Sequence, residues 1–402
     1  MDPRDGQPRD APSPFARESI ALRFAVFFLV SAGFTTIYLV QPVLPVLRLE
    51  FGVDEARASW TVSAVVLGIA LSNLPFGRIA DLHPVKPIIA AGGSAVAVFG
   101  LVCALTRSME LMIACRFLQG LFLPALTTCI AAYLSRSLPA QRLNVMMGSY
   151  VAATVVGGLS GRLIGGWIHP PLHWRYAFVT ASVLVTAATL IALKALPGEK
   201  GARPESSQDG GFPELIRRTD LLRIYSVGFS AFFVFSALFN YLPFYLSGEP
   251  FRASTNLITL MYLAYTIGVF IAPLSGRVSN RYGNGVTMVL GASILGGSLG
   301  LTHIARMGFV ALGLGGVCLG FFSVHSAAVG SMNRRLSRSR GRANSLYIMI
   351  YYLGGSAGIT LCGYGYQLFG WIGVTGLGLL MVANILAIGL VEIRQRGPED
   401  AA

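Results

Sequence analysis

The apolar residues of this chain are gathered into runs of about twenty or more, each long enough to cross the ~30 Å hydrocarbon core of a bilayer as a helix. A composition of 54% hydrophobic and 12% charged residues is too apolar for a soluble protein. No ten-residue alternating pattern of the kind found in barrel strands recurs. The sequence therefore predicts an all-α membrane protein with twelve transmembrane helices, at 22–47, 59–80, 87–105, 109–134, 143–168, 174–195, 222–246, 255–278, 285–305, 308–331, 343–368 and 371–393.

Basic residues predict the orientation of these spans. An even number of spans places both termini on one side of the membrane, and most of the 31 Lys and Arg residues fall in the tails and loops of that side. By the positive-inside rule this side is the cytoplasm, and we expect a multi-pass protein of a bacterial cell inner membrane. The same distribution accounts for the net charge of +13. The expected partner is therefore the lipid bilayer and not nucleic acid.

The five cysteines all lie within predicted spans, at spacings that suit neither a metal site nor a disulfide framework. The spans contain no constellation of nucleophile and base, and the sequence contains no P-loop pattern for binding ATP. We therefore expect no enzymatic activity, no metal, no cofactor and no direct drive by ATP. A monomer is the expected state.

The chain divides into two halves. Its one long hydrophilic connection, 196–221, has the Gly, Pro and Ser content of a flexible linker. We expect a cytoplasmic tail at 1–21, six-helix bundles at 22–195 and 222–393, and a second tail at 394–402. The halves match at an offset of 197 to 200 residues: Pro45 with Pro243, Pro75 with Pro273, Gly77-Arg78 with Gly276-Arg277, Arg142 and Asn144 with Arg342 and Asn344, and Gly157-Gly158-x-x-Gly161 with Gly354-Gly355-x-x-Gly358. Two parallel six-helix repeats are the architecture of secondary transporters that rock around a midplane site.

Four short patterns lie at matching depths of the predicted spans. They are Gly77-Arg78-Ile79-Ala80-Asp81 after span 2, Gly276-Arg277-Val278-Ser279-Asn280-Arg281 after span 8, Arg116-x-x-Gln119-Gly120 in span 4, and Gly157-x-x-x-Gly161-Arg162-x-x-Gly165-Gly166 in span 5. With these patterns the chain resembles the major facilitator superfamily from end to end. Tyr38-x-x-Gln41-Pro42, Asn240-Tyr241-Leu242-Pro243 and Tyr351-Tyr352-Leu353-Gly354 resemble the YnfM-type subgroup of bacterial inner-membrane exporters.

The two loop patterns are predicted to form a cytoplasmic gate. Its members are Gly77, Arg78, Asp81 and Arg136 in the first half, and Gly276, Arg277, Asn280 and Arg281 in the second. Gly77 is expected to let span 2 pack closely. The resemblance implies that Asp81 docks on the start of span 11 in the outward-facing state, and Arg136 is a second candidate partner. The alternative for Arg78 is an ordinary positive-inside charge.

The span 5 glycines, Gly157, Gly161, Gly165 and Gly166, are expected to allow close contact between helices. The resemblance implies antiport and hence export, because this pattern is associated with antiporters in the family. Arg162 replaces the proline of the family pattern.

We expect Arg116 and Arg162 to be the only charged residues inside the apolar spans, with all 18 Asp and Glu residues in loops or tails. One interpretation makes them part of a substrate cavity in the outer half of the membrane. Its polar residues are Tyr38, Gln41, Arg116, Gln119, Arg162, Asn240 and Tyr241. The alternatives are that Arg116 ties span 4 to backbone carbonyls of span 1, and that Arg162 extends outward to the membrane surface.

His325, deep in span 10, is the candidate for proton coupling, because histidine titrates near neutral pH. Its alternative is a packed neutral histidine bonded to Ser323 or Ser326. The predicted function is secondary active export of a small neutral or anionic molecule by alternating access, with protons as the coupling ion. An importer of organic anions or sugars and a transport-dead membrane sensor are the alternatives.

Overall fold

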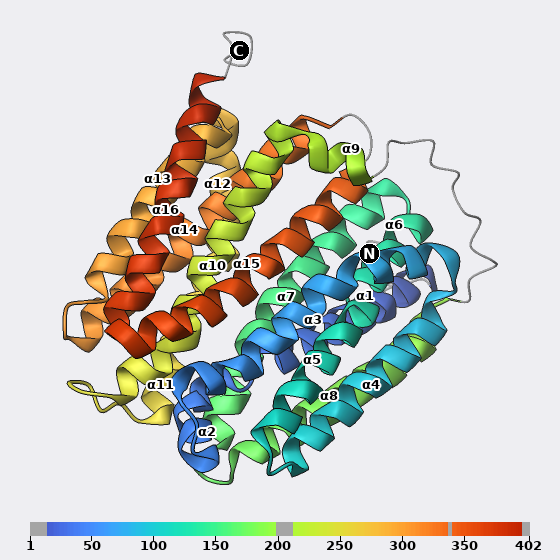
Figure 1. Cartoon of the computed structure of the whole chain (residues 1–402). Coiled ribbons are helices and arrows are strands. Elements are labelled where there is room, and N and C mark those ends of the chain that lie inside the picture. The colour runs from blue at the N-terminus through green and yellow to red at the C-terminus, as the bar shows by residue number, and fades with distance from the viewer. Residues whose placement is uncertain (1–13, 198–211, 337–339, 396–402) are drawn as a thin grey trace, which may run out of the picture.

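The computed structural model describes residues 14–197, 212–336 and 340–395, and these residues are almost entirely helical. Figure 1 shows two helical bundles side by side, one coloured blue to green and the other yellow to red. The N-terminal bundle contains α1 (Pro14–Tyr38), η1 (Gln41–Val43), α2 (Leu44–Phe51), α3 (Glu55–Leu82), α4 (Val85–Leu105), α5 (Met109–Leu126), α6 (Thr128–Ser137), α7 (Ala140–Ile168) and α8 (Trp174–Ala195). The C-terminal bundle contains α10 (Thr219–Ser247), α11 (Thr255–Met261), η2 (Tyr262–Thr266), α12 (Ile267–Tyr282), α13 (Asn284–Leu301), α14 (Met307–Arg334), α15 (Arg340–Phe369) and α16 (Trp371–Arg394).

The described residues confirm the all-α fold with its transmembrane helices. Eleven helical segments are long and apolar enough to cross a membrane. A twelfth is formed by the pair Thr255–Ile271 and Pro273–Tyr282, which is bent by 46°. The count of twelve therefore depends on reading this bent pair as one span.

Several predicted spans are interrupted. Span 1 breaks between α1 and η1, where Pro42 occupies the start of the new helical turn. Span 4 breaks at Thr127, three residues after Pro124, and span 8 bends at Pro273. Proline removes a backbone donor and clashes with the preceding turn, so each break has a local cause.

A short helix, α9 (Phe212–Arg217), lies within the range predicted as a linker, and α10 starts two residues after it. Residues 198–211 lie outside the described part, as do the tails 1–13 and 396–402. The predicted domain boundaries stay a prediction.

The glycine patterns make equivalent contacts in the two halves. A Cβ atom at Gly161 on α7 would lie 2.3 Å from the carbonyl oxygen of Thr35 on α1. A Cβ atom at Gly358 on α15 would lie 2.4 Å from that of Phe233 on α10. Only glycine allows two helix backbones to approach this closely. The two contacts are equivalent, because the glycines and their partners are separated by 197 and 198 residues, the offset that relates the halves.

The bundles meet where α3 and α15 run alongside each other (Figure 1). Ser63 Oγ on α3 lies 2.9 Å from Ser356 Oγ and 2.8 Å from Thr360 Oγ1, both on α15. Gly166 on α7 faces Thr259 on α11 so closely that a Cβ would lie 1.8 Å from Thr259 Oγ1. These contacts lie toward the side predicted to be external, so the outer ends of the two bundles are closed against each other.

Candidate functional site

Arg116 on α5 is fully buried, and its donors are bound to groups of its own bundle. Its Nη1 and Nη2 donate to the carbonyls of Thr36 (2.6 Å) and Ile37 (2.5 Å) at the end of α1, and its Nε donates to Thr61 O on α3 at 2.8 Å. Nη1 also donates to Gln119 Oε1 at 2.9 Å. These bonds place Arg116 as a tie between span 4 and the carbonyls of span 1, the alternative that the sequence left open.

Gln119 continues this tie, because its Nε2 donates to Val96 O on α4 at 2.9 Å. Tyr241 on α10 is buried and donates to Ile359 O on α15 at 2.8 Å. Both side chains are almost completely buried in this conformation. Both bind backbone carbonyls of neighbouring helices here, and their part in a substrate cavity stays a prediction.

Arg162 on α7 is also buried, with 1% of its surface exposed, so it does not extend outward to the membrane surface. Its Nε donates to Gln41 Oε1 at 2.8 Å and its Nη1 to Gly158 O at 3.0 Å. No carboxylate of the described residues forms an ion pair with it. A buried charge without a counter-charge is costly, which indicates a functional reason for keeping it.

Aromatic rings of both bundles surround the Arg162 guanidinium. The Tyr38 ring centre lies 4.2 Å from its central carbon. The C-terminal bundle supplies Tyr265 at 5.0 Å, Tyr262 at 5.3 Å and Phe239 at 5.8 Å. Cation–π attraction stabilises the charge in part. Tyr262, Tyr265 and Phe239 were not predicted, because tyrosine and phenylalanine are common in transmembrane helices and no motif marks these three.

Two polar side chains in the same predicted patch have polar atoms without a hydrogen-bond partner. Gln41 is fully buried, and its Nε2 makes no hydrogen bond. Asn240 on α10 is fully buried, and neither its Oδ1 nor its Nδ2 has a partner. An unpaired buried polar atom costs about 1–3 kcal/mol. This closed arrangement therefore holds polar groups that a different conformation or a ligand would satisfy.

His325 on α14 is half-buried and lies among aromatic rings. Its Nδ1 is 3.0 Å from the hydroxyl of Tyr347 on α15. Its ring centre lies 5.0 Å from that of Tyr351 and 6.0 Å from that of Phe321. The alternative of a packed histidine named Ser323 or Ser326 as its partner, whereas the bond found here is to Tyr347 on α15. Tyr347 was not predicted. At the ends of the spans on the side predicted to be external, burial lowers the pKa of His169 and of His303 and favours their neutral form.

At the predicted cytoplasmic gate, Arg136 Nη1 on α6 lies 2.9 Å from Asp81 Oδ1 on α3. Asp81 is therefore paired with Arg136, the second of its two candidate partners, in this conformation. Gly77 does not mediate close packing in this conformation, since a Cβ at Gly77 or at Gly276 would meet nothing within 4 Å. In the second half Arg277, Asn280 and Arg281 are exposed, and Arg281 stacks on Tyr282. Arg78 is exposed as well.

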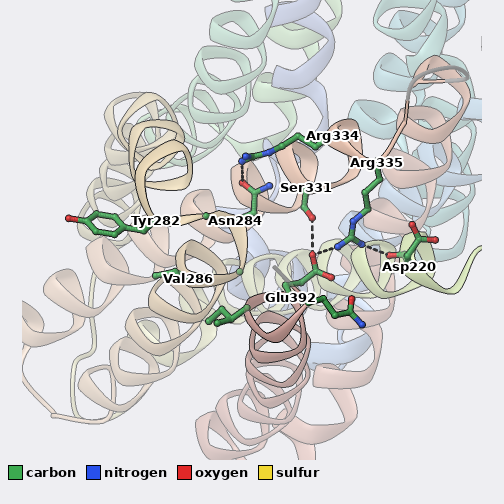
Figure 2. A pocket seen from close by; sticks show the side chains of 12 residues that line it. Asp220, Tyr282, Asn284, Val286, Ser331, Arg334, Arg335 and Glu392 are labelled. Atoms are coloured by element: carbon green, nitrogen blue, oxygen red, sulfur yellow. Dashed lines mark hydrogen bonds and ion pairs between the residues drawn. The ribbon is translucent and has the colours of Figure 1, made fainter. Parts of the chain in front are cut away.

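The expectation that the spans contain no carboxylate was wrong. Glu392 lies in the last turn of α16 with only 9% of its surface exposed. Figure 2 shows its side chain close to those of Arg335 and Ser331. The three residues line a pocket of about 470 Å³. Arg335 Nη2 binds Glu392 Oε2, and Ser331 Oγ donates to the same oxygen at 3.0 Å. This pair ties the end of α14 to the end of α16, on the side predicted to be cytoplasmic.

The second helix-end contact in this pocket joins α14 to α13. Arg334 Nη2 donates to Asn284 Oδ1 at 2.6 Å (Figure 2). Arg335 also donates to the carbonyl of Asp220 at the start of α10, at 3.0 Å. The pocket thus lies within the C-terminal bundle, and its side chains are largely satisfied by one another. The described residues hold no group of His, Cys, Asp and Glu side chains that could bind a metal ion.

Comparison with known proteins gives a consistent picture. A family model described as Major Facilitator Superfamily matches residues 24–358. The inner membrane transport protein YnfM of Escherichia coli (strain K12) is 30% identical over 393 residues, which cover 96% of this chain and 94% of YnfM. The uncharacterised MFS-type transporter YybF of Bacillus subtilis (strain 168) is 29% identical, with 90% of this chain and 91% of YybF covered.

Solved structures share the fold at low sequence identity. A bacterial homologue of the human lysosomal transporter Spinster, in an inward-facing and unoccupied conformation, matches with a TM-score of 0.74 at 16% identity, over 96% of this chain and 98% of that one. The nucleoside transporter NupG matches with a TM-score of 0.74 at 13% identity, over 94% and 99%.

Proposed function

The chain belongs to the Major Facilitator Superfamily, and from this premise we propose that it exports a small neutral or anionic molecule by alternating access, in exchange for protons. Membership makes it a multi-pass membrane transporter. The observation that carries the proposal is the buried guanidinium of Arg162. It has no carboxylate partner among the described residues and is enclosed by rings of both bundles.

The charge of the substrate follows from which side chains could balance it. A carried cation needs a carboxylate within the membrane, whereas an anion needs a positive group. In the described spans the carboxylates lie at helix ends, and the one that is buried, Glu392, is already paired with Arg335. Arg162 is therefore the group available to balance a substrate, and the charge that it can balance is negative.

Alternating access is supported by the contacts between the bundles. Arg162, Gln41 and Asn240 are enclosed on the side predicted to be external. Opening this side would separate Arg162 from Tyr262 and Tyr265, which belong to the other bundle. The unpaired amides would then be free to bind water or substrate, so the closed and open states differ in what satisfies these groups.

His325 is the proposed proton-coupling residue. It is half-buried, its Nδ1 is bound to Tyr347, and it is distant in sequence from the outer histidines. A histidine in such a place can gain and lose a proton as its surroundings change between conformations. We further propose that the protein acts as a monomer in a bacterial inner membrane, with both termini in the cytoplasm.

The test is uptake into inverted membrane vesicles, with and without an acidic lumen, over a panel of cationic, neutral and anionic compounds. Vesicles from cells that lack the protein serve as the control. We expect protein-dependent accumulation of a neutral or anionic compound that stops when the pH gradient is collapsed. Accumulation confined to cations would contradict the proposal.

The same panel separates the alternatives. Accumulation in right-side-out vesicles alone would identify an importer. The absence of protein-dependent flux across the whole panel, with normal insertion of the chain, would favour a sensor.

A further inference from the structure

Resting on the export proposed above, we infer that the substrate is an anion with a flat aromatic body, such as an aryl carboxylate or sulfonate. Its anionic group would bind Arg162 and its ring would stack on a row of aromatic side chains in the C-terminal bundle. This aromatic row consists of Tyr265, Phe235, Phe321, His325 and Tyr351.

The aromatic row leads without a gap from Arg162 to His325. The Tyr265 ring lies 5.0 Å from the Arg162 guanidinium carbon. The centres of Tyr265 and Phe235 are 5.7 Å apart, and those of Phe235 and Phe321 are 4.0 Å apart. Phe321 and His325 follow at 6.0 Å with nearly parallel rings. These spacings lie within the range in which aromatic rings attract each other.

Three rings of the row have no aromatic counterpart in the N-terminal bundle. At every offset from 197 to 200 residues, the positions that correspond to Tyr265, His325 and Tyr351 hold no aromatic residue. Within the same range Tyr38 corresponds to Phe235 and Phe122 to Phe321, so these two rings are common to both halves. Tyr265, His325 and Tyr351 are therefore particular to the C-terminal bundle.

Part of the row is accessible. Tyr265, His325 and Tyr351 are half-buried, while Phe235 and Phe321 are buried behind them. Tyr265 and Tyr38 come from different bundles and both lie against the Arg162 guanidinium. The accessible rings thus belong to the surface between the bundles, where an alternating-access substrate must pass.

The chemistry of this surface selects for both parts of such a molecule. A guanidinium binds carboxylate or sulfonate oxygens through two parallel N–H groups, which a neutral ligand cannot match in strength. A flat ring stacks on tyrosine and phenylalanine more favourably than a saturated ring of similar size. An aromatic anion uses both features at once.

The experiment compares uptake of matched pairs of probes into inverted vesicles. The pairs are benzoate with cyclohexanecarboxylate, and benzenesulfonate with cyclohexanesulfonate, because sulfonates stay ionised and do not leak as neutral acids. We expect the aromatic member of a pair to be carried about fivefold faster.

Tyr265→Phe should keep this preference, and Tyr265→Leu should reduce the ratio of aromatic to saturated uptake rates to near one. Tyr364→Leu, at an exposed tyrosine of α15, is the control and should leave it unchanged.

Two outcomes would overturn the inference. If aromatic and saturated anions were carried equally by the wild-type chain, the inference would fail while the proposed export of anions stood. If the preference survived Tyr265→Leu together with Tyr351→Leu, the row would not be its source. Transport of cations alone would remove the proposed function and the inference together.

Discussion

Arg116 and Arg162, the two buried arginines of the N-terminal bundle, differ in what their side chains bind. Arg116 donates to backbone carbonyls of α1 and α3, and removing it would leave those carbonyls unpaired. Arg162 binds one glutamine and one carbonyl, and otherwise faces rings, two of them from η2 of the other bundle. Arg116 therefore holds the N-terminal bundle together. Arg162 would lose the contacts with the rings of η2 when the bundles move apart.

Arg162→Gln should reduce transport of an anionic substrate by about ten- to a hundredfold, the factor that loss of a charged hydrogen bond supplies. Arg162→Lys keeps the charge but cannot reach both Gln41 and Gly158, so an intermediate rate is expected. Initial rates in vesicles, normalised to inserted protein, measure the effect. Arg107→Gln, at an exposed residue between α4 and α5, is the control. Wild-type rates in Arg162→Gln would rule out its role as the counter-charge.

Sequence patterns located these residues only in part. Arg162, Gln41 and Tyr38 were grouped because spans 1 and 5 place them at similar depth, and the structure joins them. Tyr265 could not be found this way, since its role depends on how η2 of one bundle faces α7 of the other. Glu392 could have been found, because it lies inside the last predicted span.

At the scale of helices, glycine spacing decides how closely pairs can pack. Gly161→Val should prevent normal folding, because a Cβ there would lie 2.3 Å from the Thr35 carbonyl oxygen. Gly148→Val on the same helix is the matched control, since its surroundings are open. The yield of monodisperse protein and its melting temperature measure the difference. Equal stability of the two variants would contradict the tight α1–α7 contact.

The Asp81–Arg136 pair should matter for gating more than for stability. It is exposed, and exposed ion pairs contribute about 0–1 kcal/mol. Asp81→Asn should therefore leave the melting temperature nearly unchanged while it alters the transport rate. The exchange of charges, Asp81→Arg with Arg136→Asp, should restore part of that rate. A large loss of thermal stability in Asp81→Asn would instead identify the pair as a structural tie.

The helices themselves were largely predictable, because apolar length determines a span, whereas their interruptions were not marked in advance. The prolines that break spans 1, 4 and 8 were visible in the sequence. A proline can also be tolerated inside a transmembrane helix, as Pro75 is within α3. Which proline ends a helix depends on the neighbours that satisfy the freed backbone groups.

At the scale of the whole molecule, the polar contact of Ser63 with Ser356 and Thr360 joins the bundles near the outer ends. A disulfide in its place should hold this side closed. In a background without the five native cysteines, Ser63→Cys with Thr360→Cys should cross-link under oxidation and stop transport, and reduction should restore it. Either single variant is the control. Full transport by the cross-linked protein would show that these ends need not separate.

The most direct test of the account follows proton movement in inverted vesicles whose lumen has been acidified. Adding the compound that the vesicle panel identifies should raise the luminal pH, because each molecule carried inward is exchanged for protons moving out. This response should be absent in Arg162→Gln and in His325→Gln vesicles. Accumulation of the compound with no change in luminal pH, or with further acidification, would contradict proton-coupled export.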